Sequence, residues 1–191
     1  MLLYFIRHGQ TDWNKDMRMQ GQSDIPLNEN GRKSAIEAGK TLANTHIDLA
    51  FSSPLKRAKE TAELVLAGRD IPIIEDKRIE EICFGICEGM RGRDENGQPV
   101  GCFAEFFAHP EQYKAPENGE DAKMLCARTW NFLEDITTRE ELQDKSILIA
   151  THGAALQSMM LSARPMSVGS TSPHSFRMTM GMPKAVDSTR S

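Results

Sequence analysis

The sequence has 191 residues and a formal net charge of −4, a length that suits one domain with a single substantial core. Lys and Arg are dispersed along the chain, which gives no sign of a nucleic-acid-binding surface, and no apolar run approaches the ~20 residues that a membrane-spanning helix needs. A small anionic substrate remains compatible with the net charge, because a local cluster of Arg is enough to bind it.

The cysteines form no C-x-x-C pair and follow no zinc-ligand spacing (Cys83, Cys87, Cys102 and Cys126). Nothing at the N-terminus resembles a signal peptide, so we expect reduced thiols and a cytoplasmic protein. His, Asp and Glu follow no metal-ligand spacing, and residues 94–97 predict a turn rather than a calcium loop. We therefore expect no metal and no cofactor.

The first predicted element is a strand over residues 2–6, where the apolar side chains are continuous. Such runs are typical of strands buried on both faces of a parallel sheet. Arg7, His8 and Gly9 follow at once, and ligands of open α/β sheets bind at the carboxyl ends of the strands. Arg7 and His8 are therefore candidate site residues. Taken alone, however, a histidine here is more often a surface or capping residue, and Gly9 could simply allow a tight turn.

Residues 10–26 are polar with little periodicity, which predicts a loop beside the candidate site. The elements expected next are a helix capped by Asn28 that ends near residue 44, a strand over residues 47–51, and a helix capped by Ser52 or Ser53, with Pro54 at its first position, that ends at Gly68.

Arg57 falls in the first turn of that second helix. Free amides at a helix N-terminus already favour an anion, and a guanidinium adds a bidentate phosphate donor. We therefore expect Arg57 to point to the same place as Arg7. The neighbouring Lys56 and Lys59 are better explained as a solvated face.

A short strand over residues 71–74 precedes two adjacent carboxylates, Glu80 and Glu81. Adjacent side chains point in different directions, so we expect one of them to face the site and the other to be a solvated charge. From there to about Gly119 the chain is irregular, except for a short helix around residues 103–108, and a loop-rich insertion this long is usually functional.

A helix is expected from Glu120 to about residue 137, with an ordinary core stripe at helical spacing (Leu125, Thr129, Phe132, Leu133 and Ile136). A strand over residues 146–151 then runs directly into His152 and Gly153, as the first strand runs into His8 and Gly9, and a helix over residues 154–163 follows. This alternation predicts an α/β fold with a parallel sheet between layers of helices.

Convergence of the two histidines with Arg7 and Arg57 would create a site for a phosphoryl group. Phosphoryl transfer needs mainly positioning and positive charge on the phosphate oxygens, which the two arginines and His152 would supply. His8 is the better candidate for a nucleophile that forms a phosphoenzyme. A carboxylic acid, Glu80 or Glu81, would protonate the leaving oxygen and later take a proton from water.

Five stretches of the chain occur in the order that is typical of one family: RHGQTDWN (7–14), QGQSDIPLNENG (20–31), SSPLKRAKETA (52–62), EEICFGICEG (80–89) and ATHG (150–153). Over about residues 1–163 the chain resembles the histidine phosphatase superfamily, the phosphoglycerate-mutase-like group. This resemblance implies a three-layer α/β/α sandwich with a mostly parallel sheet.

By that resemblance His8 is the phosphorylated nucleophile and Glu81 is the general acid. Arg7, Arg57 and His152 surround the phosphate. Further substrate or phosphate contacts are implied within the matching motifs (Asn14, Gln20, Gly21, Ser23 and Gly153). Cys87 stands where many relatives have Trp, which we expect to affect packing rather than catalysis.

The favoured function is a phosphomonoester hydrolase, a histidine phosphatase acting on a small phosphorylated substrate. Phosphatases and mutases of the family share the core residues, and access of water separates them. Residues 116–120 resemble the phosphatase branch, which includes alpha-ribazole phosphatase and broad phosphomonoesterases. The alternatives are a cofactor-dependent phosphoglycerate mutase, which is an isomerase, and a non-catalytic phosphate-binding member. Homodimers are common among relatives, but no feature of this sequence argues for one independently.

We expect residues 1–191 to form one histidine-phosphatase domain with an atypical tail over residues 164–191. The tail is rich in Ser, Thr, Pro and Met and contains no run that is typical of a core strand. Relatives normally continue there with strand-forming sequence. The hypothesis is that divergence or a shifted reading frame leaves the sheet without its last strand.

Overall fold

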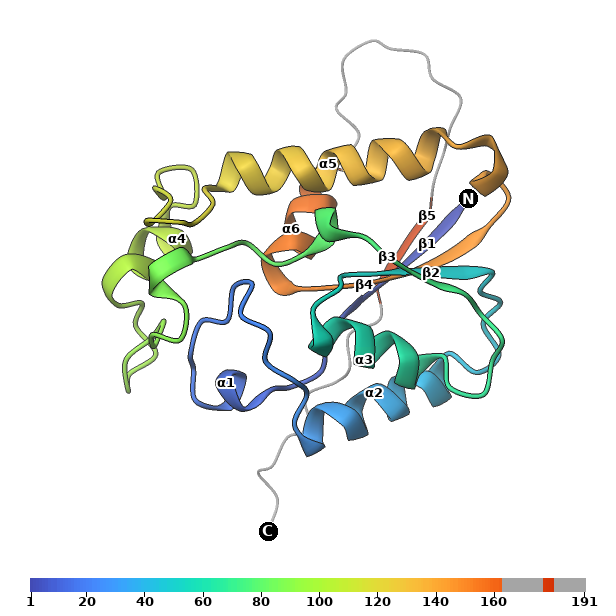
Figure 1. Ribbon diagram of the computed structural model, residues 1–191, viewed down its shortest axis with the longest axis horizontal. Helices are drawn as coiled ribbons and strands as arrows, with labels where there is room; N and C mark the ends of the chain where they lie inside the picture. The colour runs from blue at the N-terminus through green and yellow to red at the C-terminus, as the bar shows by residue number, and fades with distance from the viewer. Residues whose placement is uncertain (163–176, 181–191) are drawn as a thin grey trace.

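The protein folds into three layers in a computed structural model that describes residues 1–162 and 177–180. Figure 1 shows helices α5 (Ala122–Thr138) and α6 (Gly153–Ser162) on one face of a sheet, and α2 (Glu29–Thr41) and α3 (Lys56–Val65) on the other. The predicted α/β/α sandwich is therefore confirmed. None of the helices in the described ranges is long and apolar enough to cross a membrane.

The sheet contains five described strands in the order β3-β2-β4-β1-β5, and every neighbouring pair is parallel. These strands are β1 (Leu2–Arg7), β2 (Leu49–Ser52), β3 (Ile73–Glu75), β4 (Ser146–Thr151) and β5 (Arg177–Met180). Because Arg7 pairs with Thr151 in register, the chain leaves β1 and β4 at the same edge of the sheet. His8 and His152 are the next residues.

Alternate side chains of the central strands enter two separate cores. Leu3 and Phe5 of β1 pack on the α5 and α6 side, whereas Ile6 packs on the α2 and α3 side. This is the period-2 alternation of a strand that is covered on both faces. The predicted stripe of α5 is buried throughout, which confirms it as core.

The two helices on the α2 and α3 side begin in different ways. Asn28 caps α2 as predicted, and its side chain accepts a hydrogen bond from the amide of Gly31 (2.9 Å). The predicted cap of α3 is wrong, because Leu55 occupies that position and makes no side-chain cap. Ser53 is instead hydrogen-bonded to His152. Arg57 nevertheless lies in the first turn, as expected.

Short helices interrupt the connecting segments. Helix α1 (Asp12–Lys15) lies inside the segment predicted as a loop, and α4 (Ala104–Ala108) lies where a short helix was expected. The described 3-10 helices are η1 (Lys77–Ile79), η2 (Gly85–Cys87), η3 (Gly101–Phe103) and η4 (Glu140–Leu142). The turn predicted at residues 94–97 is confirmed by the bond from the amide of Gly97 to the carbonyl of Asp94 (3.0 Å).

The expectation of a sheet without its last strand is wrong. Residues Arg177–Met180 form β5 and pair in parallel with Leu2–Phe5 of β1. An edge strand pairs through backbone groups, so it does not need the continuous apolar run of a central strand. The rest of the predicted tail, residues 164–176 and 181–191, lies outside the described residues.

Candidate active site

Two histidines from neighbouring strands meet at the carboxyl edge of the sheet. The ring centroids of His8 and His152 are 5.1 Å apart. His8 is 7% exposed, and His152 is fully buried behind it. The amide of His8 donates to the carbonyl of Thr151 (3.0 Å), so the β1–β4 pairing continues into the site. The structure thus brings together the two residues that the sequence pattern paired.

The contacts of His8 determine which of its nitrogens is available. Its Nδ1 lies 2.7 Å from the carbonyl oxygen of Gly9. A carbonyl can only accept, so the ring hydrogen is on Nδ1 and Nε2 keeps its lone pair. Burial, the positive charge of Arg57 and, to a lesser degree, that of Arg7 lower the pKa of His8 to about 3. The imidazole is therefore neutral at neutral pH, as a nucleophile must be.

His152 has a different environment. Its Nε2 lies 2.8 Å from the hydroxyl of Ser53, while no described group is bonded to its buried Nδ1. Burial and the charge of Arg57 hold the pKa of His152 well below its usual value. The expectation that His152 supplies a positive charge is therefore wrong, because its buried imidazole is neutral.

Arg57 is the buried cation of the site. Its two terminal nitrogens donate to the carbonyls of Ser23 (2.8 Å) and Gly21 (2.6 Å), and its Nε has no partner among the described residues. Burial lowers the pKa of the guanidinium, against the opposing effect of nearby carboxylates, Glu81 first. The 20–23 loop thus fixes the orientation of Arg57 next to the histidines.

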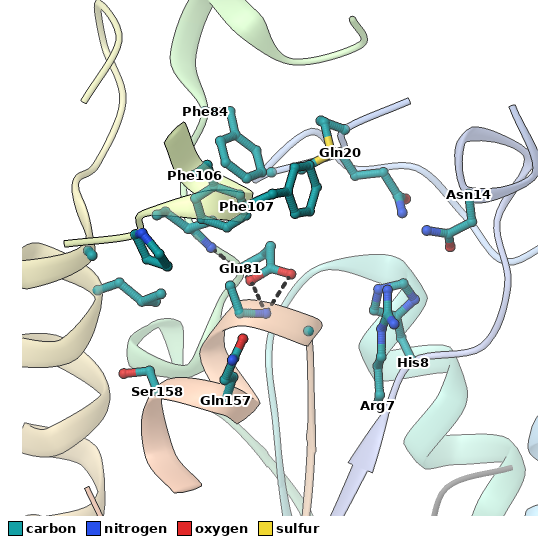
Figure 2. A pocket seen from close by; sticks show the side chains of 18 of the residues that line it. Arg7, His8, Asn14, Gln20, Glu81, Phe84, Phe106, Phe107, Gln157 and Ser158 are labelled. Carbon is teal, nitrogen blue, oxygen red and sulfur yellow. Dashed lines mark hydrogen bonds between the residues drawn. The ribbon is translucent and has the colours of Figure 1, made fainter. Parts of the chain in front are cut away.

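Glu81 lies at the N-terminus of α6, and both of its oxygens accept from the amide of Ala154 (3.1 and 3.2 Å; Figure 2). Its Oε1 also accepts from the amide of Ala155 (3.1 Å). A β-carbon on Gly153 would lie 3.5 Å from Cζ of Arg7 and 3.6 Å from Oε2 of Glu81. Arg7 and Glu81 therefore flank Gly153. The guanidinium of Arg7 is exposed and makes no hydrogen bond or ion pair with a described residue, so it can receive an anion.

Arg7, His8, Arg57 and Glu81 line a cavity of about 520 Å³, whereas the fully buried His152 is not among its lining residues. Figure 2 shows Arg7 and His8 on one side of it and an aromatic wall of Phe84, Phe106 and Phe107 on another. Between them lie polar and apolar side chains from α5, α6 and the 14–21 segment, among them Asn14, Arg18, Met19, Gln20, Leu125, Gln157, Ser158 and Leu161. The cavity thus combines a cationic end, a carboxylate and a wall suited to an organic group.

The sequence profile of the histidine phosphatase superfamily (branch 1) matches residues 3–179. The chain belongs to this superfamily. The phosphoglycerate-mutase-like fold expected from the sequence motifs is thereby confirmed, and family membership identifies the protein as an enzyme of the phosphatase and phosphoglycerate mutase group.

Both activities occur among similar proteins. A 2,3-bisphosphoglycerate-dependent phosphoglycerate mutase of Cytophaga hutchinsonii is 32% identical over 163 residues, which cover 84% of this chain and 76% of that protein. The structure of YhfR from Bacillus stearothermophilus has a TM-score of 0.74 at 36% identity, covering 85% of this chain and 79% of that one. The alpha-ribazole phosphatase of Shigella flexneri has a TM-score of 0.72 at 29% identity, covering 87% and 80%.

Four of the five predicted substrate contacts line the cavity: the glycines Gly21 and Gly153, and the two amides Asn14 and Gln20. The side-chain oxygens of both amides face Thr11: Oδ1 of Asn14 accepts from the amide of Thr11 (3.1 Å) and Oε1 of Gln20 accepts from its hydroxyl (2.9 Å). Their amide NH₂ groups are thereby left to donate toward a ligand.

Ser23 and Glu80 are not brought into the cavity. The hydroxyl of Ser23 donates to Glu88 (2.5 Å), and its carbonyl accepts from Arg57, so the structure gives it a supporting position rather than a direct contact. Glu80 was expected to be a solvated charge. It is half-buried, and this burial raises its pKa.

The sequence motifs did not single out two further residues that organise the site. Thr61 accepts a bond from the amide of Gly9 (3.0 Å) and donates to the carbonyl of Arg57 (2.6 Å). Glu88 accepts from the amides of Gln22 and Ser23 (both 2.8 Å). Thr61 and Glu88 lie inside the matching motifs, but the contacts join segments far apart in sequence, so local spacing carries no signal for them.

Among the described residues, no group of three or more His, Cys, Asp or Glu side chains is arranged to hold a metal ion.

Proposed function

We propose that the protein hydrolyses phosphomonoesters through a phosphohistidine on His8. The observation that carries this proposal is the neutral, buried His8: its Nδ1 hydrogen is bound to Gly9, which leaves Nε2 for attack on phosphorus beside Arg7 and Arg57. We further propose that residues 1–191 act as one domain, in the cytoplasm, on a small phosphorylated substrate.

In the first step of the proposed reaction, Arg7, Arg57 and the amides of Asn14 and Gln20 bind the phosphate oxygens, which positions phosphorus and takes up its charge. Nε2 of His8 attacks phosphorus, and the bond from phosphorus to the alcohol oxygen breaks.

The departing alcohol oxygen takes its proton from the protonated Glu81. In the second step the Glu81 carboxylate takes a proton from water as that water attacks phosphorus. The P–N bond then breaks, and phosphate leaves with His8 restored.

His152 has a supporting role in this proposal. Its Nε2 faces the hydroxyl of Ser53, which accepts from the amide of Leu55 (3.3 Å) and, in this proposal, donates its own hydrogen to Nε2. The His152 hydrogen is then on Nδ1, the buried nitrogen without a described partner. A neutral His152 would contribute this N–H to a phosphate oxygen.

The aromatic wall favours a hydrolase. Phe84, Phe106 and Phe107 face the cationic end across the cavity, where they suit an organic group with an apolar face. One observation favours the mutase instead: Arg18 also lines the cavity, and it could hold a second anionic group. A mutase needs such a contact, because it returns the phosphoryl group to a second position of an acidic substrate.

The first test is hydrolysis of p-nitrophenyl phosphate in EDTA by the native chain, His8→Ala and Glu81→Gln. We expect the native chain to be active with the chelator present and His8→Ala to lose at least ~1,000-fold in kcat. Glu81→Gln should retain part of the first step, because p-nitrophenolate leaves without much protonation.

Release of phosphate from 3-phosphoglycerate, compared with conversion to 2-phosphoglycerate, separates hydrolase from mutase. Phosphate binding without turnover of either ester would identify a non-catalytic member. Activity that survives in His8→Ala would disprove the phosphohistidine mechanism.

A further inference from the structure

The segment that carries Glu81 has no regular secondary structure. Residues 80–83 lie between the 3-10 helices η1 and η2 and belong to no strand. Neither a helix nor a strand ladder fixes the backbone of Glu81, so its position depends on individual contacts. The side chain is bound by the amides at the start of α6 and by the amide of Ile82 (3.0 Å), and the backbone needs contacts of its own.

Arg128 on α5 binds the backbone of this segment at several points, whereas Nε2 of Gln22 binds it only at the carbonyl of Glu81 (3.1 Å). One terminal nitrogen of Arg128, NH1, donates to the carbonyls of Arg78 (2.9 Å) and Glu80 (2.7 Å), and the other, NH2, donates to the carbonyl of Glu81 (2.8 Å). A single guanidinium therefore binds three backbone carbonyls within residues 78–81. The planar guanidinium has five N–H donors in a rigid arrangement, and the single ammonium nitrogen of a lysine could not bind these carbonyls together.

Glu120 fixes Arg128 in turn. Nε of Arg128 donates to Oε1 of Glu120 and NH2 donates to Oε2, both at 2.8 Å. Oε2 also accepts from the amide of Cys83 (2.9 Å), and the amide of Glu120 donates back to the carbonyl of Cys83 (2.8 Å). The side chains of Arg128 and Glu120 are only 18% and 15% exposed. The pair is thus a mostly buried bridge from α5 to both ends of residues 80–83.

Burial alone would disfavour a charged Glu120. The hydrogen bonds from Arg128 and the amide of Cys83 outweigh that effect and lower its pKa below the usual value. The carboxylate is therefore charged over the same pH range in which a phosphatase works, and the bidentate geometry is maintained there.

We propose that Arg128 and Glu120 are positioning residues for the general acid, holding the backbone of Glu81 so that its carboxylate reaches the leaving oxygen. This inference rests on the proposed function. Proton transfer requires the donor within hydrogen-bond distance of the oxygen, and a misplacement of ~1 Å can cost ~100-fold in rate. Neither residue contacts the substrate in this proposal.

The test compares two esters in Arg128→Met. An alkyl phosphate has a poor leaving group that needs the acid, whereas p-nitrophenyl phosphate needs little protonation. We expect kcat/KM to fall ~100-fold for propyl phosphate and less than ~5-fold for p-nitrophenyl phosphate, as a displaced acid predicts. Glu120→Gln should give the same selective loss to a smaller degree.

Arg139→Met is the matched control, because Arg139 directly follows α5 and its side chain bonds only to Asp135 among the described residues. It should change neither value. Arg128→Lys keeps the cation without the fork, so it should resemble Arg128→Met and provides a second variant if Arg128→Met fails to fold. An equal loss on both esters, or no loss on propyl phosphate, would overturn the proposal.

A second measurement does not depend on turnover. Hydrogen exchange at the amides of Ala154 and Ala155 reports whether Glu81 is still bound to α6, and exchange there should be faster in Arg128→Met than in Arg139→Met. A native chain that hydrolyses neither ester would refute the proposed function alone. Unchanged exchange at both amides in a folded Arg128→Met would refute the positioning role.

Discussion

At the scale of single residues, the site concentrates groups that burial makes costly. Arg57 and His152 are fully buried, and His8 nearly so. The protein lowers that cost in two ways: the imidazoles stay neutral, and the carbonyls of Gly21 and Ser23 bind the buried guanidinium of Arg57. Neutral imidazole is also what a nucleophile requires, so the burial that costs stability contributes to reactivity.

The neutral state of His8 makes the fold sensitive to acid. An unfolded histidine titrates near 6.5, and folded His8 near about 3. Between these values only the unfolded chain binds the proton, so the free energy of unfolding falls as pH falls from about 6.5 toward 3, at up to ~1.4 kcal/mol per pH unit from His8 alone. Above pH 6.5 the imidazole is neutral in both the folded and the unfolded state, so His8 no longer lowers the free energy of unfolding.

His8→Asn should flatten the pH dependence by that amount. The measurement is urea unfolding of the native chain and His8→Asn at several pH values between about 4 and about 6. The charge of His8 is a lesser cause of the lowered pKa of His152, so the difference in slope belongs to His8 and, to a smaller degree, to its effect on His152. Parallel curves would show that His8 is protonated in the folded protein over this range.

At the scale of elements, a loop determines the direction of Arg57. Gly21 has φ +53°, and a β-carbon there would lie 2.0 Å from Oε1 of Glu88. Gly68, at the end of the segment after α3, has φ +78° and nothing within 4 Å of the same position. The two glycines share a left-handed backbone, and only Gly21 also has a neighbour in the way.

Replacement of each glycine by alanine should therefore separate the effect of backbone strain from the effect of displacing Glu88. We expect Gly21→Ala and Gly68→Ala each to lose roughly 1 kcal/mol of stability from the left-handed backbone. Gly21→Ala should in addition push Glu88 away, shift the carbonyl that binds Arg57, and weaken vanadate binding at least ~10-fold. Titration of both variants with vanadate checks this. Equal vanadate affinities would contradict the assigned role of the loop.

The elements differ in how far the sequence determined them. The strands β1 and β4 were predictable because each is a continuous apolar run, and the buried face of α5 followed from its helical spacing. The start of α3 was not, since Leu55 takes the cap position and the hydroxyl of Ser53 is shared between the amide of Leu55 and Nε2 of His152. Such competition between partners is decided by tertiary structure.

The residues of the site differ in the same way in how far the sequence predicted them. His8 and His152 were paired correctly because each ends a recognisable strand, and Arg57 because it opens a helix. The contacts of Glu88 and Arg128 were invisible, because each joins backbone groups of segments that come together only in the folded chain. Ser23 was placed in the motif correctly, but its hydroxyl points to Glu88. A motif thus locates a residue without giving the direction of its side chain.

At the scale of the molecule, the strand order makes β1 an interior strand. β4 pairs with β1 on one side and β5 pairs with it on the other, although β5 comes from the far end of the chain. Figure 1 shows β1 and β5 side by side in the sheet between the helical layers. β5 pairs with Leu2–Phe5, so it supports the strand that His8 directly follows.

Loss of β5 should therefore affect both stability and activity. A chain that ends at residue 180 retains β5, and a chain that ends at residue 176 differs from it only by the loss of Arg177–Met180. We expect the shorter chain to be less stable by about 3 kcal/mol, since it loses several backbone hydrogen bonds worth ~0.5–1.5 kcal/mol each and leaves β1 as an exposed edge. Urea unfolding and p-nitrophenyl phosphate hydrolysis of the two chains measure this difference. Equal stability of the two would mean that β1 and its histidine are held by β4 alone, and that the pairing with β5 adds nothing in solution.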